Sequence, residues 1–229
     1  MIFLLSMLLS GNINVSGVII YILSALAVIF LTQPVHEFAH AWTAVKLGDP
    51  TPRYQGRLSV NPFAHIDYFG AACILLLGFG WAKPVQVNMN NFRNPKRDMA
   101  ITAAAGPISN LIAALVMLVI TNLLNLVLLN TSLSWAVYIT VFFYYIADIN
   151  VSLAVFNLIP IPPLDGSRLL FAVLPNRQYY KLMRYERYIF YGLLVLIWFG
   201  VLDIPLNFLT NAVMSFLSFI AGLPFRFLG

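Results

Sequence analysis

The segment VSGVIIYILSALAVIFLTQPVHEFAHAWTAV, residues 15–45, decides the fold class of this chain. It is apolar almost throughout, and it is longer than the roughly 20 residues that a helix needs to cross a bilayer. Near its end it carries three ionisable side chains within five positions: His36, Glu37 and His40. Such residues are costly at the centre of a bilayer and usually functional there. The segment therefore predicts a membrane-spanning helix that carries a polar site.

The composition of the whole chain is that of a membrane protein. Of its 229 residues, 61% are hydrophobic and 9% are charged, whereas soluble domains carry about 25% charged residues. The Lys and Arg residues gather in short stretches between apolar runs, which indicates membrane topology rather than nucleic-acid binding. The single cysteine, Cys73, excludes an internal disulfide. Residues 1–9 lack the positive start of a signal peptide, so we expect no cleavage there.

Further apolar runs follow the first segment and set the expected architecture. They cover residues 69–81, 99–129, 133–159, 188–202 and 204–223. Every basic stretch lies on the cytoplasmic side if the N-terminus is outside and the short run 69–81 enters and leaves on one face. A sixth full span would place one basic stretch on the wrong side.

The sequence thus predicts an all-α polytopic membrane protein with five to six transmembrane helices and a short membrane-embedded re-entrant loop or β element. We favour five spans plus the re-entrant element, in which Gly78 and Gly80 suit irregular backbone. Residues 1–229 are expected to form a single membrane-embedded domain, without a separate soluble part.

The pattern His36-Glu37-Phe38-Ala39-His40 is an H-E-x-x-H motif within the first predicted span. Side chains four positions apart share one face of a helix, so both imidazoles can reach one metal ion. The adjacent Glu37 is placed to take a proton from an attacking water. A purely structural role is disfavoured, because three ionisable groups in an apolar span are hard to explain by packing.

A catalytic zinc takes three protein ligands, so a third must come from elsewhere in the chain. We favour Asp165, which follows an apolar span in a proline-rich break and returns to the leaflet where the first span ends. Asp148, inside the span 133–159, and His65, in the loop after the first span, remain alternatives.

Together, three motifs resemble those of the site-2 protease family of intramembrane zinc metalloproteases, in its compact branch without a PDZ domain. They are HEFAHA at 36–41, NPFAHID at 61–67 and FNLIPIPPLDG at 156–166. The segments GFGWAKPVQVN at 78–88 and AAGPISN at 104–110 add to the resemblance.

The resemblance implies a function and a set of metal ligands. It makes the chain a zinc metalloendopeptidase that cleaves peptide bonds within or near transmembrane segments, with a membrane protein as substrate and the bilayer as surroundings. His36, His40 and Asp165 match the family's ligands for one Zn²⁺ per chain, and Glu37 matches its catalytic glutamate.

The resemblance also implies roles around the metal. Asn157 matches an asparagine that holds the substrate or the oxyanion, and His65 matches a residue that assists the site without binding zinc. Gly78 and Gly80 resemble a G-x-G element beside the substrate. A spanning substrate helix must unwind before attack, and an edge strand near residues 84–88 would hold the unwound piece by β-addition.

Two other classes of function share some of these features. A metal transporter would use the same ligands, but it has no evident need for Glu37 as a base; a non-catalytic membrane scaffold has no need for the complete motif. We find neither a G-x-S-G serine motif nor the G-x-G-D of paired-aspartate proteases. The expected location is a multi-pass position in a prokaryotic cell membrane, with the site about ten residues, or ~15 Å, from the basic cytoplasmic end at Lys46.

Overall fold

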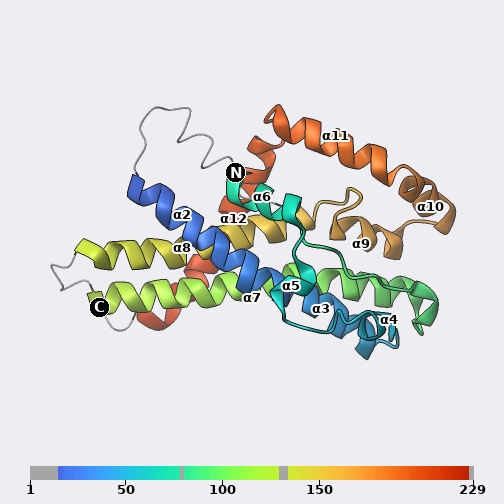
Figure 1. Ribbon diagram of the computed structural model, residues 1–229, viewed down its shortest axis with the longest axis horizontal. Helices are drawn as coiled ribbons and strands as arrows, with labels where there is room; N and C mark the ends of the chain where they lie inside the picture. Colours follow the sequence, from blue (N-terminus) through green and yellow to red (C-terminus); the bar gives the residue numbers. More distant parts are fainter. Residues whose placement is uncertain (1–14, 78–79, 129–133, 227–229) are drawn as a thin grey trace.

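The computed structural model describes residues 15–77, 80–128 and 134–226, and within these ranges every regular element is helical (Figure 1). The all-α class is therefore confirmed. The elements are α2 (Val15–Ala27), η1 (Val28–Thr32), α3 (Gln33–Lys46), α4 (Thr51–Tyr54), α5 (Pro62–His65), α6 (Tyr68–Leu77), η2 (Met89–Asn91), α7 (Pro95–Leu128), α8 (Ser134–Asn157), α9 (Asp165–Val173), α10 (Asn176–Arg184), α11 (Glu186–Trp198), α12 (Asp203–Gly222) and η3 (Leu223–Phe225).

Four helical segments of the described chain are long and apolar enough to cross a membrane, so the protein is an integral membrane protein. They are Val15–Lys46, Pro95–Leu128, Trp135–Asn157 and Asp203–Phe225. Large apolar side chains are exposed along all four, as expected for surfaces that face lipid.

The predicted span over residues 188–202 differs from the structure. There α11 has 13 residues, or about 20 Å, which falls short of a hydrocarbon core about 30 Å thick. Gly200, at φ +70°, ends the helix, with Gly200 N–H donating to Ile197 O and Val201 N–H to Leu196 O. This is a Schellman turn, which needs a residue in the left-handed region at the glycine position. The sequence placed the end of this run at residue 202, close to the turn at Gly200, but the helix before the turn is too short to be a span.

The short run at 69–81 does not form a spanning helix. α6 has 10 residues, about 15 Å long; Gly78 lies outside the described residues, while Gly80 lies against the backbone of α6, where a Cβ would meet Gly70 O at 2.1 Å. Residues 80–88 follow without regular structure, so the expected edge strand near 84–88 is not formed. No second strand lies beside it in the described chain, and a strand needs a partner for its ladder.

α7 is the central helix, and it packs against α3, α8, α9 and α12. Its buried surface is rich in small residues, among them Ala103, Gly106 and Ala114. Small side chains let neighbouring backbones approach closely, which is how helices associate in lipid. This close packing brings α3 and α9, far apart in sequence, to the same stretch of α7.

A wide turn interrupts the first spanning segment just before the H-E-x-x-H motif. Between α2 and α3, η1 is a π-helix whose first carbonyl, Val28 O, accepts from Gln33 N–H. Pro34 follows at once and has no N–H to donate to the preceding turn. A π turn is a known way for a helix to accommodate such a break.

The described spans run roughly along the long axis of the molecule, in alternating directions (Figure 1). The end of α3, the start of α7, and α10 lie toward one end of that axis, while α12 ends toward the opposite end, where α7 also ends. Five spans would bring the end of α12 back to the face that carries the basic stretches. Because α11 is too short to cross, α12 ends on the opposite face instead.

Candidate metal centre

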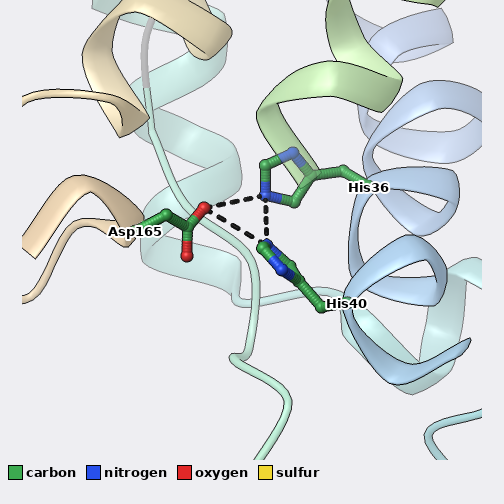
Figure 2. Close-up of side chains that lie close together, drawn as sticks. All are labelled: His36, His40 and Asp165. Atoms are coloured by element: carbon green, nitrogen blue, oxygen red, sulfur yellow. Dashed lines mark hydrogen bonds and ion pairs between the residues drawn. The ribbon is translucent and has the colours of Figure 1, made fainter. Parts of the chain in front are cut away.

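Three side chains from two helices converge on one point. His36 and His40 project from the same face of α3, and Asp165 stands at the first position of α9 (Figure 2). The distances are 3.1 Å between the two Nε2 atoms, 3.2 Å from His40 Nε2 to Asp165 Oδ2 and 3.3 Å from His36 Nε2 to Asp165 Oδ2. These donor atoms could hold a metal ion.

The donor set at this point suits a metal cation. His40 Nδ1 donates to the Thr102 carbonyl at 2.7 Å, so Nε2 is the ring atom that faces the other two donor atoms. Burial alone would raise the pKa of the Asp165 carboxyl, but the imidazoles of His40 and His36 hold that pKa below its usual range. A metal ion at this point would take one Nε2 atom from each histidine and one oxygen from the carboxylate.

The geometry also fits the size of zinc. Ligands 2.0–2.1 Å from a tetrahedral zinc lie about 3.3 Å from one another, close to the spacing of the three donor atoms. Room for the ion comes from Gly106 on α7, where a Cβ would lie 2.2 Å from His40 Nε2 and 2.6 Å from His36 Nε2. The residues present therefore fit a zinc ion.

A cleft of about 300 Å³ opens beside the three donors. Glu37 and Asn157 both line it, and both side chains are buried. The Glu37 carboxylate accepts a hydrogen bond from Val85 N–H, with 3.3 Å between Val85 N and Oε2. The cleft thus places one carboxylate and one amide beside the candidate metal position.

The two alternative third ligands lie elsewhere. Asp148, on α8, belongs neither to the cluster of three donors nor to the lining of the cleft. His65 is buried at the end of α5, where its ring donates to Ser59 O from Nε2 at 2.7 Å. It lines a smaller neighbouring cavity together with Gln33 and Asp67, two residues that also line the cleft.

The segment of residues 80–88 crosses the cleft and is tied down by three of its own N–H groups. Lys83 N–H donates to His65 O at 2.7 Å, Val85 N–H to Glu37, and Asn88 N–H to Asp49 Oδ2 at 2.7 Å. The backbone carbonyl of His65 thus contacts the segment that also contacts Glu37.

Asp49 is fully buried and anchors the far end of this segment. Besides Asn88, its carboxylate accepts from the side chain of Asn91 and from Thr51. Burial alone would raise the pKa of Asp49, but the hydrogen bonds from Thr51, Asn91 and Asn88 outweigh it and hold the pKa below its usual value.

Three residues of the site escaped prediction from the sequence. Thr102 and Val85 act through backbone atoms, which leave no signature in residue type. Gly106 did leave a signature in the sequence, because glycine inside an apolar helix costs stability and usually marks a place where another group packs closely against the helix. Its partner could not be known without the packing of α7 on α3.

Comparison with known proteins gives two kinds of match. A family model described as "Peptidase family M50" matches residues 21–200. The "Putative zinc metalloprotease YwhC" of Bacillus subtilis is 39% identical over 162 residues, covering 71% of this chain and 74% of YwhC. The "Putative zinc metalloprotease Rip2" of Mycolicibacterium smegmatis is 31% identical over 140 residues, covering 58% of this chain and 50% of Rip2. No solved structure matches the chain significantly.

Proposed function

The chain belongs to peptidase family M50 and is an intramembrane zinc metalloprotease of that family, and we propose that it cleaves transmembrane segments of other membrane proteins at the His36–His40–Asp165 centre. The observation that carries this proposal is the convergence of three metal-binding side chains beside Glu37, in a cleft between helices long enough to span a bilayer. The site would hold one Zn²⁺ per chain.

Glu37 is the proposed general base. Zinc, when bound, supplies a Lewis acid for the scissile carbonyl and lowers the pKa of the attacking water to about 7. Glu37 takes the proton of that water and delivers it to the leaving amine. The hydrogen bond from Val85 N–H fixes the carboxylate at the wall of the cleft. Asn157, which lines the cleft, would donate its amide N–H to the carbonyl oxygen as negative charge develops.

Residues 80–88 are the proposed docking edge for an unwound substrate. Lys83 and Val85 use their N–H groups within the protein, and neighbouring residues of an extended chain point the other way. The N–H groups of Ala82 and Gln86 have no partner among the described residues. Pro84 has no N–H, so it leaves no donor without a partner. A substrate strand would supply the missing partner by β-addition.

In the proposed topology the basic ends of α3, α7 and α10 face the cytoplasm of a prokaryotic cell, with the site toward that side. Four spans and a non-spanning α6 support this placement, with residues 69–81 as the re-entrant element. His65 would act by supporting residues 80–88, through the hydrogen bond that its carbonyl accepts from Lys83 N–H.

The test compares purified wild type with Glu37→Gln in liposomes that carry a tagged single-span protein. Glu37→Gln should keep its zinc and lose cleavage, because glutamine accepts the hydrogen bond of Val85 and cannot take a proton. Glu186→Gln, at the start of α11 and outside the cleft, is the matched control and should cleave as wild type does. A Glu37→Gln variant that retains zinc and full cleavage would remove Glu37 from the mechanism.

A further inference from the structure

One cation in the wall of the cleft has no role in the proposed chemistry. Arg168 lies three positions after Asp165 on α9, so the two side chains share a face of that helix. It lines the cleft and is partly buried, unlike Arg177, Lys181 and Arg184, which are more exposed on α10. Arg168 is therefore a guanidinium at the edge of the reaction site.

Within the described residues, Arg168 has no ion pair and no hydrogen bond. The carboxylates that line the cleft already have partners. Asp165 faces His36 and His40, Glu37 accepts from Val85 N–H, and Asp67 accepts from Gly70 N–H at 2.8 Å. A partly desolvated guanidinium without a counter-charge is suited to bind an anionic ligand.

On the basis of the proposed function, we infer that Arg168 selects substrates by charge: it binds an acidic side chain that flanks the scissile bond. The planar guanidinium matches a carboxylate with two parallel hydrogen bonds. Much of the cleft wall, including Phe156, Leu193 and Leu194, is apolar and suits the membrane-buried part of the substrate.

The same residue discriminates against the commonest membrane helices. Transmembrane helices carry an excess of Lys and Arg at their cytoplasmic ends. A substrate of that kind would bring a second cation beside Arg168 in a partly desolvated cleft, where repulsion is weakly screened. Arg168 thus excludes ordinary basic flanks and admits acidic ones.

The test uses a library of single-span proteins that share one apolar segment and differ in one flanking residue, Asp, Asn or Lys, scanned over successive positions. Cleavage is measured as kcat and KM in liposomes for wild type, Arg168→Lys, Arg168→Gln and Arg168→Glu. Zinc content and thermal unfolding of each variant are measured alongside. At one flanking position, wild type should prefer Asp over Lys by about tenfold or more in kcat/KM, the factor typical of a charge-assisted hydrogen bond.

The variants distinguish recognition of the flanking charge from other roles of Arg168. Arg168→Lys should keep the preference for Asp, Arg168→Gln should remove it, and Arg168→Glu should invert it in favour of Lys. If Arg168→Glu fails to fold or loses zinc, Arg168→Gln still carries the comparison, because it removes the charge without reversing it. An unchanged Asp-to-Lys ratio in Arg168→Gln overturns the inference.

Three further outcomes also decide against the inference. If Arg168→Gln lowers kcat equally for substrates with Asp, Asn or Lys at the flanking position, then Arg168 acts on the reacting carbonyl rather than on the flanking residue. Wild type that cleaves the library without regard to charge overturns this inference alone. Wild type that binds zinc and cleaves no library member overturns the proposed function, and the inference falls with it.

Discussion

Replacing Gly106 with alanine is expected to weaken zinc binding strongly while leaving the helices formed. The new Cβ would lie 2.2 Å from His40 Nε2 and 2.6 Å from His36 Nε2. To reach an ordinary contact of 3.4 Å, these nitrogens would have to retreat by about 1.2 Å and 0.8 Å. Zinc sites tolerate deviations of only about 0.2 Å in ligand distance. The shift is several times that tolerance, so at least one imidazole is lost as a ligand.

The His40 ring has little freedom to make that retreat. Its Nδ1 is held by Thr102 O, which lies one turn before Gly106 on the same helix. Moving the ring away from α7 would break this buried hydrogen bond, at a cost of about 1–3 kcal/mol. We therefore expect the zinc affinity of Gly106→Ala to fall by more than about a hundredfold, beyond the loss typical of outer-shell changes.

The assay is zinc content per purified chain, with affinity from competition by a chelator and helicity from circular dichroism. Gly192→Ala is the matched control, because Gly192 lies on α11 and a Cβ there meets nothing within 4 Å. It should bind one zinc per chain, as wild type does. If Gly106→Ala folds and binds zinc with wild-type affinity, then His36, His40 and Asp165 do not hold the ion in the arrangement of Figure 2.

The same contacts lead to three other predictions. Asp165→Asn should lose zinc while Asp148→Asn keeps it, as metal analysis of the two purified variants would reveal; the reverse pattern would make Asp148 the third ligand. Asp49→Ala should lower the free energy of unfolding by about 1.5–3 kcal/mol at pH 7, the range for hydrogen bonds to a charged group. Because the folded-state pKa of Asp49 is lowered, its contribution to stability is fully present above the usual value of about 3.9 and is lost as the pH falls through the folded-state pKa. The free energies of unfolding of wild type and Asp49→Ala should therefore converge in acid. A difference that stays constant with pH would contradict this. Val85→Pro removes the N–H that holds Glu37 and should lower kcat about tenfold with zinc retained, whereas Val85→Ala keeps the N–H and should cleave normally; equal rates would show that this bond is dispensable.

The sequence predicted best what one helix determines by itself. His36 and His40 share a face because of helical periodicity, which no later packing can alter. Asp165 could be chosen by topology only as one of three candidates, and the motif around it narrowed the choice. Its meeting with the two histidines depends on how α3 and α9 pack on α7, which spacing along the chain does not encode.

Hydropathy predicted too many spans because it counts apolar residues and not turns. Residues 188–202 are apolar enough to suggest a span, yet α11 has only 13 residues and ends in the Schellman turn at Gly200. The expected β element at residues 84–88 failed for a different reason. An extended segment becomes a strand only with a partner, and in the proposed mechanism that partner is the substrate.

The π turn Val28–Thr32 sets the register between the two halves of the first spanning segment. Before it, Tyr21 and Ala25 pack in a cluster with residues of α8, and after it the histidine face meets α7. Each residue added to or removed from a helix rotates all later residues of that helix by about 100°. Loss of one residue here would swing both imidazoles away from Asp165, while exchange of one apolar residue for another would not. The number of residues in this stretch, more than their identity, is what the metal centre depends on.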